Sequence, residues 1–357
     1  MISTFPSFAK INLGLRIGPQ RPDGFHELRT VYQTVALHDL IRVSVARGSG
    51  IEIRCDDPRV PRDKTNTCWK MVECAMLALK VRGRVVIEIE KRLPVQGGLG
   101  GASGNAVAAL IALERALQKQ ISGPERLRIA AEVGSDLPLF LVGGTVLGVG
   151  RGEEVYPLPD LLAMECVVAL PEIAVSTPNA FLEWDRLLKE PAELRSTWTG
   201  KSARSHMAGR DPADLREEKL TPSNGSDRML EFGREISAWL NAGPVASKPR
   251  RSGVSARGGG RAENPLLDLV RTGIENDFEK VVFPKHPELR EVKSVLERAG
   301  AKYASLSGSG SAVYGLFDSR ARADNAAKKL KKSGTRAVVT STLTRRQYWK
   351  KLLAPSL

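Results

Sequence analysis

A glycine-rich turn carries the clearest chemical signal in this sequence of 357 residues. Residues 97–104 read Gly-Gly-Leu-Gly-Gly-Ala-Ser-Gly, between an alternating apolar run at 85–90 and an Ala- and Leu-rich run at 105–118. The flanking patterns predict a strand followed by a helix. Successive glycines let a backbone approach a phosphate, and a helix start directs unpaired N–H groups and a positive dipole end at it. The turn therefore predicts an anion site built from backbone.

Two common phosphate loops do not match this turn. The P-loop ends on Gly-Lys-Ser/Thr, whereas this turn ends on Ala102-Ser103-Gly104. The dinucleotide pattern GxGxxG, started at Gly98, reaches Ser103 where it requires a glycine. A glycine-rich turn of another kind can also be purely structural, so the turn alone leaves both a phosphate site and a structural turn open.

Two further short segments accompany the turn, one towards each end of the chain. Residues 9–15 read Ala-Lys-Ile-Asn-Leu-Gly-Leu, and residues 306–312 read Leu-Ser-Gly-Ser-Gly-Ser-Ala. Together with residues 93–106, and in this order, they resemble the three motifs of the GHMP kinase superfamily. That superfamily includes galactokinase, homoserine kinase, mevalonate kinase and phosphomevalonate kinase. A Ser-Gly repeat alone is more often a linker, so the resemblance depends on all three segments occurring together.

Four additional segments narrow the resemblance. They are Arg21-Pro22-Asp23-Gly24-Phe25-His26-Glu27-Leu28, Gly134-Ser135-Asp136-Leu137-Pro138-Leu139-Phe140, Gly148-Val149-Gly150-Arg151-Gly152-Glu153 and Asn276-Asp277-Phe278-Glu279. This set is typical of the 4-diphosphocytidyl-2-C-methyl-D-erythritol kinases of the non-mevalonate (MEP) isoprenoid pathway, and the match covers about residues 5–185 and 264–320. It implies ATP-dependent phosphorylation of the 2-hydroxyl of that cytidine diphosphate substrate.

The resemblance implies a two-domain α+β fold of the GHMP kinase type. An N-terminal ATP-binding domain, similar to ribosomal protein S5 domain 2, is expected at residues 1–160. A ferredoxin-like C-terminal domain is expected at residues 161–357, with a polar, basic insertion at about 190–264. The apolar patterns predict strands at 7–17, 41–54, 85–90, 145–148, 165–170 and 338–342, two strands within 303–317, and helices at 66–82, 105–118, 125–133, 226–240, 265–279, 287–299 and 321–333.

The resemblance also implies roles for single residues. Lys10 and Asp136 match the catalytic pair of the family. A carboxylate can take the proton of an alcohol, and an ammonium group can stabilise the transferred charge; which of the two dominates is left open. Asn12 matches a position that hydrogen-bonds near the reacting hydroxyl.

The cytosine of the substrate is expected to be recognised by His26 and to lie between the rings of Phe25 and Phe181. The family has Tyr at the position of Phe25; stacking tolerates the exchange because the π-face is kept, while the hydrogen bond of the phenol is lost. A place for Phe181 in the hydrophobic core is an open alternative.

ATP is expected to place its phosphates on the glycine-rich turn, with Mg²⁺ bridging them. The expected ATP-binding residues are Asn66, on the adenine side, and Gln96, Gly97, Gly98, Leu99, Gly100, Gly101, Ala102, Ser103, Gly104 and Asn105. The third motif adds Ser307, Gly308, Ser309, Gly310 and Ser311. The usual motif has a second serine where this chain has Gly104, so Ser103 supplies the hydroxyl for phosphate or Mg²⁺.

The net charge of +14 first suggests a polyanionic partner. Residues 320–357 hold 11 basic residues and one acidic residue, and residues 241–261 hold five basic residues and no acidic one, so these segments carry +10 and +5 and the remainder nets −1. No aromatic residue between Leu240 and Ala262 offers a stacking platform. We expect solvated basic surfaces and no nucleic-acid partner.

Two alternatives to the cytidine-substrate kinase are kept. One is another small-molecule GHMP kinase, of the homoserine or mevalonate type, and the other is a non-catalytic nucleic-acid-binding protein on the same fold.

Cysteine, histidine and hydropathy patterns exclude several other classes. Four cysteines without CxxC spacing do not form a disulfide framework, and with four histidines they do not favour a zinc site. No apolar run approaches 18 residues, and the N-terminus lacks the pattern of a secretion signal. We therefore expect a cytoplasmic protein with no membrane partner, either a monomer or a homodimer.

Overall fold

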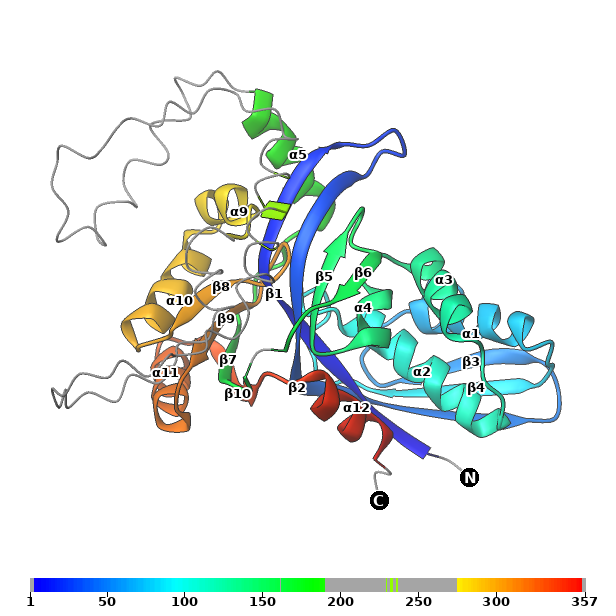
Figure 1. The fold of residues 1–357 in the computed structure, drawn as a ribbon. Helices are drawn as coiled ribbons and strands as arrows, with labels where there is room; N and C mark the ends of the chain where they lie inside the picture. The colour runs from blue at the N-terminus through cyan, green and yellow to red at the C-terminus, as the bar shows by residue number, and fades with distance from the viewer. Residues whose placement is uncertain are drawn as a thin grey trace, which may run out of the picture.

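Two long antiparallel strands form the axis of the molecule. The computed structural model describes residues 3–160, 162–189, 229, 232–233, 236 and 275–354. Strand β1 (Ser3–Gln20) pairs with β2 (His26–Ala46) from Ser3 opposite Val43 to Gln20 opposite His26. The two strands run together between the two halves of the fold (Figure 1). Nearly every residue of β1 from Phe5 to Ile17 is buried, because the strand is covered on both faces.

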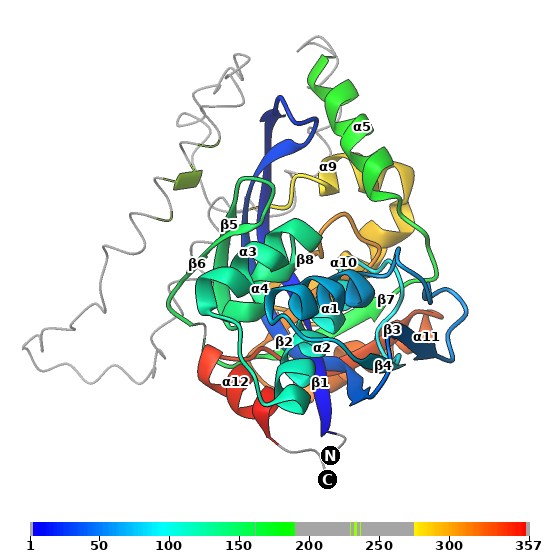
Figure 2. The same cartoon turned by 90° about the vertical axis from the view of Figure 1, so that its right-hand side faces the viewer.

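The first half is a mixed sheet covered by helices. Its order is β3-β4-β2-β5-β6, with β1 also paired to β2; β3 and β4 are parallel and the other neighbours are antiparallel. The elements not yet defined are β3 (Gly50–Cys55), α1 (Thr67–Ala78), β4 (Arg84–Glu90), α2 (Gly101–Leu117), α3 (Gly123–Val133), α4 (Leu137–Val142), β5 (Thr145–Val149) and β6 (Glu154–Pro157). The helices lie together over the sheet (Figure 2).

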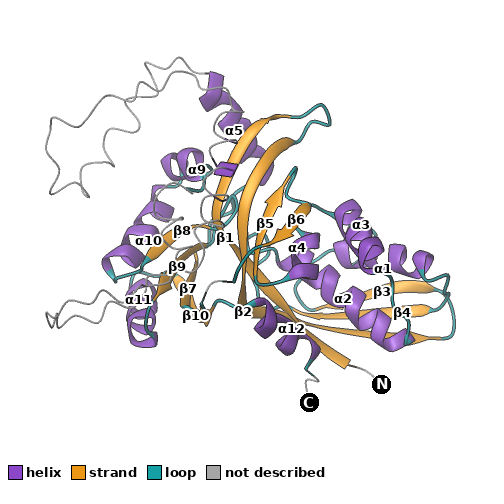
Figure 3. Cartoon of the chain, viewed as in Figure 1, coloured by secondary structure: helices purple, strands orange, loops and turns teal. Residues whose placement is uncertain are grey.

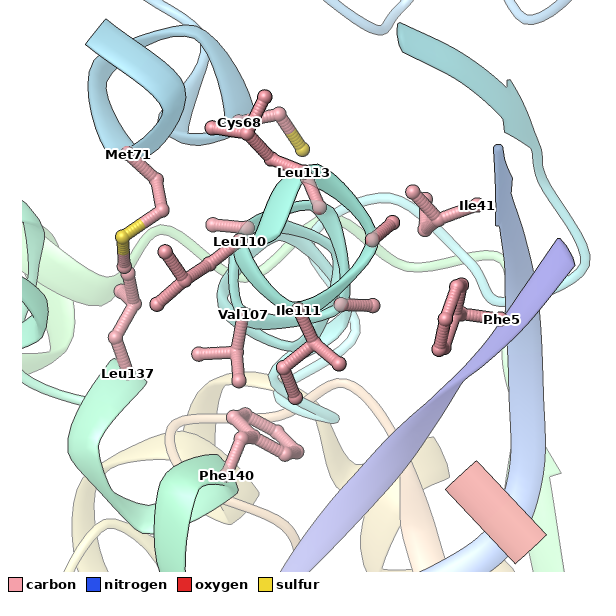
Figure 4. Packing of buried hydrophobic residues seen from close by; sticks show 14 of the residues in the cluster. Phe5, Ile41, Cys68, Met71, Val107, Leu110, Ile111, Leu113, Leu137 and Phe140 are labelled. Carbon is pink, nitrogen blue, oxygen red and sulfur yellow. The ribbon is translucent and has the colours of Figure 1, made fainter. Parts of the chain in front are cut away.

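Helix α2 is the centre of this half. Every residue from Gly104 to Glu114 is buried, as expected for a helix that is apolar around most of its circumference. Side chains from the strands (Phe5, Ile41), from α1 (Cys68, Met71) and from α4 (Leu137, Phe140) surround it (Figure 4). The glycine-rich turn is thus attached to a helix that is buried over most of its length.

The second half is an antiparallel four-stranded sheet with helices against it. Its order is β10-β7-β9-β8. Its elements are β7 (Glu165–Leu170), α5 (Thr177–Lys189), α9 (Glu279–Lys285), α10 (Pro287–Arg298), β8 (Tyr303–Leu306), β9 (Val313–Phe317), α11 (Arg320–Lys332) and β10 (Arg336–Ser341). Helices α10 and α11 lie on the outer side of this sheet (Figure 3). Helix α11 buries Ala323, Ala326, Ala327 and Leu330 and exposes its lysines, so the basic segment has the solvated helix face that was expected.

The last helix returns to the first half. Helix α12 (Arg345–Leu353) buries Tyr348 and Leu352 in the same core as Phe8 and Phe140. The start of β1 lies near α12 (Figures 1 and 2). The division into domains near residue 160 stays a prediction.

The α+β class is confirmed, and the differences from the predicted elements have local causes. The predicted strand 41–54 is two strands, because Gly48 and Gly50 take φ values of +122° and +102° and turn the chain. Residues 276–278 form a bridge and a turn rather than the end of a helix over 265–279, and residues 265–274 lie outside the described residues. Most of the predicted helix 226–240 and of the insertion 190–264 also lies outside them.

Short or polar elements escaped the sequence patterns. The elements α4, β6, α9 and α12 were not predicted, because each is too short to show a clear apolar period. Residues 26–40 of β2 and helix α5 were also missed, although Ala180, Trp184 and Leu187 of α5 follow a helical period. None of the helices in the described part of the chain is long and apolar enough to cross a membrane.

Three buried tyrosines give the fold a dependence on alkaline pH. Tyr32, Tyr314 and Tyr348 are each no more than 2% exposed, and burial raises the pKa of each phenol well above its usual value. The unfolded chain releases these protons from about pH 10, whereas the folded chain retains them. The contribution of these tyrosines to the free energy of unfolding is therefore constant below about pH 10 and falls above it.

We expect the free energy of unfolding to fall as the pH rises above about 10, by roughly 1.4 kcal/mol per pH unit for each of these tyrosines. Tyr348→Phe should remove one such contribution and make the decline shallower. Urea unfolding followed by circular dichroism from pH 8 to pH 11 measures both slopes. Equal slopes in the wild-type protein and the variant would contradict the prediction.

Candidate active site

Strand β1 carries a lysine and an asparagine where its other side chains are mostly apolar. The side chain of Lys10 is only 4% exposed, its Nζ donates a hydrogen bond to Asn12 Oδ1 at 2.7 Å, and it lies 3.4 Å from Asp136 Oδ2. Asn12 Nδ2 in turn donates to Thr30 Oγ1 at 2.8 Å. The structure therefore brings together Lys10, Asn12 and Asp136, three of the residues singled out in the sequence.

Asp136 lies immediately before α4, and its side chain is about one-third exposed. Its Oδ1 accepts a hydrogen bond from the hydroxyl of Tyr32 at 3.0 Å. Burial, and secondly the negative charge of Asp136, raise the pKa of Tyr32 well above 10, so this phenol is a neutral donor at physiological pH. Tyr32 was not predicted as a site residue. The sequence around it does not indicate a contact with Asp136, which is 104 residues away.

The glycine-rich turn is held against β1 and the third motif. The backbone N–H of Lys10 donates to Leu99 O at 2.9 Å. A Cβ at Gly98, which has a φ of +73°, would collide with the backbone oxygen of Ser307, and Ser307 Oγ donates to Gly98 O at 2.9 Å. A glycine is therefore required at position 98 for the glycine-rich turn and the third motif to touch.

Helix α2 begins directly after this turn. Its first N–H groups, at residues 101–103, have no carbonyl partner one turn earlier in the helix, whereas Gly104 N already donates to Gly100 O at 2.8 Å. These groups and the helix dipole favour an anion at this end. The anion site predicted from sequence thus has a backbone structure that suits it.

The third motif is fixed by the segment Asn276–Glu279. Asn276 Nδ2 donates to Leu306 O at 2.9 Å and to Gly308 O at 2.7 Å. Glu279 Oε1 accepts from Ser305 Oγ and from Leu306 N, at 2.8 and 2.9 Å. An ideal Cβ at Gly308 would lie 3.5 Å from Lys10 Nζ, so this motif borders the lysine. All three motifs meet around one ammonium group.

There is a steric reason for Gly104 at the position where the usual motif has a second serine. A Cβ at this position would lie 2.8 Å from Phe8 O and 2.9 Å from Ser7 Oγ. Position 104 therefore faces β1, while Ser103 before it is partly exposed. The hydroxyl that this chain lacks relative to the usual motif would have pointed into the fold.

Asn66 serves as a helix cap. Its Oδ1 accepts from Cys68 N at 2.8 Å, and its Nδ2 donates to Pro61 O at 2.7 Å. The neighbouring Thr67 Oγ1 donates to Ala102 O at 2.9 Å, which ties the start of α1 to the start of α2. This structural role accounts for Asn66, and a contact with adenine stays a prediction.

A second group of predicted residues lies near the β1–β2 turn. The rings of His26 and Phe181 stack with centroids 4.8 Å apart and planes 12° apart, and His26 Nε2 lies 2.7 Å from Asp185 Oδ1. Phe25 is 52% exposed, with the Arg151 guanidinium 5.0 Å from its ring centroid. His26 thus covers one face of Phe181, so a base held between Phe25 and Phe181 stays a prediction. Phe181 also contacts Phe278 at 4.9 Å between centroids, in line with the alternative that it contributes to the core.

Asp39 is a buried carboxylate that sequence reasoning missed. It is fully buried and accepts from Lys91 Nζ at 2.5 Å, Arg92 N at 2.7 Å, Leu93 N at 2.8 Å and Asn105 Nδ2 at 3.0 Å. These partners lie on both sides of the glycine-rich turn. A single carboxylate therefore joins the chain entering the turn to the helix that leaves it.

Comparison with known proteins agrees with this architecture. Residues 66–144 match the GHMP kinases N-terminal domain, and residues 263–336 match the GHMP kinases C-terminal family. The chain is 34% identical over 314 residues to the 4-diphosphocytidyl-2-C-methyl-D-erythritol kinase of Solibacter usitatus, covering 88% of this chain and 81% of that protein. It is 33% identical over 328 residues to the enzyme of the same name from Acaryochloris marina, covering 92% and 91%.

Solved structures are similar over almost the whole chain. A crystal structure of 4-(cytidine 5'-diphospho)-2C-methyl-D-erythritol kinase has a TM-score of 0.64 and 25% identity, covering 95% of this chain and 98% of that one. Homoserine kinase from Cytophaga hutchinsonii has the same TM-score at 19% identity, covering 96% and 94%. The similarity to homoserine kinase concerns the fold alone.

We expect Asp39→Asn to lower the free energy of unfolding by about 3–5 kcal/mol, because it leaves the ammonium of Lys91 buried without its counter-charge. The double variant with Lys91→Met should recover part of that loss, since no uncompensated charge is left. Urea unfolding measures both. Glu52→Gln, which removes one partner of the exposed pair with Arg54, is the control and should leave the midpoint nearly unchanged. An Asp39→Asn variant as stable as the control would contradict the prediction.

Proposed function

The chain belongs to the 4-diphosphocytidyl-2-C-methyl-D-erythritol kinases, a branch of the GHMP kinases, and from this membership we infer that it phosphorylates the 2-hydroxyl of 4-diphosphocytidyl-2-C-methyl-D-erythritol with ATP. The products are the 2-phosphate and ADP, and the reaction belongs to the non-mevalonate route to isoprenoid precursors. The observation that carries the assignment is the meeting of Lys10, Asp136, the glycine-rich turn and the third motif at one place.

We propose that Lys10 and Asp136 act together on the reacting alcohol. Tyr32 occupies Oδ1 of Asp136, and Oδ2 lies on the side of Lys10. An alcohol at Oδ2 would lose its proton to the carboxylate as its oxygen attacks the γ-phosphorus of ATP. The Lys10 ammonium beside it would stabilise the negative charge that develops on the transferred group. Asn12, which orients Lys10 at 2.7 Å, would position both groups.

GHMP kinases use ATP as the phosphoryl donor, and we propose that its phosphates lie at the N–H groups of residues 101–103. Phosphate and hydroxyl oxygens are ligands that suit magnesium, and we propose Mg²⁺ as the metal ion. Within the described residues no three His, Cys, Asp or Glu side chains gather into a metal cluster, which fits an ion held mainly by phosphate oxygens and water. The hydroxyl of Ser103 is the oxygen ligand that we propose to complete its shell. When bound, the ion would neutralise phosphate charge.

Recognition of cytosine is proposed to involve His26, Phe25 and Phe181. His26 is 7% exposed and is held by Asp185, so its ring is fixed. Phe25 is the most exposed of the three, with Arg151 against its ring, and offers an open surface for stacking. The cytoplasmic location and the choice between monomer and homodimer stay predictions.

We expect the purified protein to release ADP from ATP when 4-diphosphocytidyl-2-C-methyl-D-erythritol is added, and not when homoserine or mevalonate is added. A coupled assay of ADP release measures this. Because only a site that recognises cytidine should bind CDP, isothermal titration with CDP provides an independent readout. Turnover of homoserine or mevalonate, without turnover of the cytidine substrate, would overturn the assignment.

We expect Lys10→Ala and Asp136→Ala each to lower kcat by about 10²–10⁴-fold, since each removes a group that acts in the transition state. Steady-state kinetics at saturating substrates measure the loss, and circular dichroism checks the fold. Lys119→Ala, at an exposed lysine after α2, is the matched control and should retain full activity. An active Lys10→Ala/Asp136→Ala double variant would remove both residues from the chemistry.

A further inference from the structure

The β5–β6 turn, Gly148–Glu153, includes the last two residues of β5 and is a sequence motif to which the proposed function gives no role. Strand β5 pairs with β2 in a register that places Val146 opposite Tyr32 and Gly148 opposite Thr30. The turn therefore lies beside the strand that carries Tyr32. Its glycines have contacts that explain their positions, and these contacts lead to the catalytic carboxylate.

Two glycines of this turn leave room for the Tyr32 side chain. A Cβ at Gly148 would lie 2.5 Å from Tyr32 Cε2, and a Cβ at Gly152 would lie 2.5 Å from the Tyr32 hydroxyl oxygen. At Gly152 the φ of +100° also disfavours any other residue. The ring and the hydroxyl are each in contact with backbone at a position where a side chain would not fit.

The rest of the turn is held in place by its own charged residues. Glu153 Oε2 accepts from Arg151 N at 2.6 Å, and Glu153 Oε1 accepts from Arg151 Nε at 3.1 Å. Gly150 O accepts from Leu28 N at 2.6 Å, which attaches the turn to β2. Hydrogen bonds within the turn and from the turn to β2 thus hold the backbone that surrounds the Tyr32 hydroxyl.

The hydroxyl held in this way points at Asp136. Tyr32 is 2% exposed, and its hydroxyl donates to Asp136 Oδ1 at 3.0 Å, while Asp136 Oδ2 is 3.4 Å from Lys10 Nζ. Lys10 Nζ also lies 5.5 Å from the centre of the Tyr32 ring. Because burial and the nearby carboxylate raise its pKa, the phenol keeps its proton and can only donate to the carboxylate.

We propose that Tyr32 is a positioning residue for Asp136, and that the turn Gly148–Glu153 holds the Tyr32 hydroxyl in the orientation in which it donates to Asp136. The inference rests on the proposed role of Asp136 in the reaction. A carboxylate that is one-third exposed can rotate into water unless it is held. The bond to Tyr32 fixes one oxygen, so the other is presented to the alcohol beside Lys10, and the orientation is established before the substrate binds.

This role predicts an effect on turnover rather than on nucleotide affinity. Tyr32→Phe removes only the hydroxyl and keeps the ring. We expect kcat for the cytidine substrate to fall about 10- to 100-fold, the range for loss of one hydrogen bond to a charged group. KM for ATP should stay within twofold, because the phosphate site is built from residues that the variant does not touch.

Tyr348→Phe is the matched control. Tyr348 is equally buried, and its hydroxyl donates to Phe140 O at 2.7 Å, outside the site. We expect a similar fall in the thermal midpoint for both variants, and an unchanged kcat only for Tyr348→Phe. A Tyr32→Phe enzyme with wild-type kcat would overturn the inference, as would an equal loss of kcat in both variants. If the wild-type enzyme does not turn over the cytidine substrate, the proposed function fails instead.

A second pair of variants keeps the test open if Tyr32→Phe does not fold. Gly152→Ala places a methyl group against the Tyr32 hydroxyl, whereas Gly150→Ala, also at a positive φ of +69°, places its methyl group nearest to the Glu153 carboxylate. We expect kcat to fall at least tenfold further in Gly152→Ala than in Gly150→Ala. Equal kcat values in these two variants would overturn the role of the turn.

Discussion

A buried ammonium group is the constraint on which the site depends. Lys10 lies in the middle of a strand that is covered on both faces, where an unpaired charge would cost several kcal/mol. The fold compensates by surrounding Nζ with the oxygen of Asn12, the carboxylate of Asp136 and the face of Tyr32. These groups come from β1, from the start of α4 and from β2. Burial of one charge thus requires several distant segments to converge, and the same convergence creates the proposed reactive centre.

The glycines of the site are explained by contacts within the protein as much as by a ligand. Gly98 allows the glycine-rich turn to touch the third motif, Gly104 allows α2 to lie against β1, and Gly152 allows the turn after β5 to enclose the Tyr32 phenol. In each case the missing side chain is replaced by another part of the chain. A sequence rich in glycine at these points therefore describes a tightly packed junction between motifs, and the open N–H groups at 101–103 are one outcome of that packing.

The sequence predicted those features that are local or carried by a motif. The α+β class and the turn before α2 followed from short segments and their order, and the pairing of Lys10 with Asp136 followed from the family that these segments resemble. Tyr32, Asp39 and α12 did not, because each acquires its role from partners that are remote in sequence; Asp39, for instance, meets Lys91 and Asn105 52 and 66 residues away. The stacking of His26 on Phe181 was likewise not foreseen, since periodicity says nothing about which rings come into contact.

The position of α12 affects how the protein is made. The hydroxyl of Tyr348 donates to Phe140 O across 208 residues of sequence, and Tyr348 and Leu352 complete the apolar core beside α4 and β1. During synthesis the ribosome releases the segments with Lys10 and Asp136 long before it releases α12. Until α12 has emerged, the first half of the nascent chain therefore lacks part of the apolar core that packs beside α4.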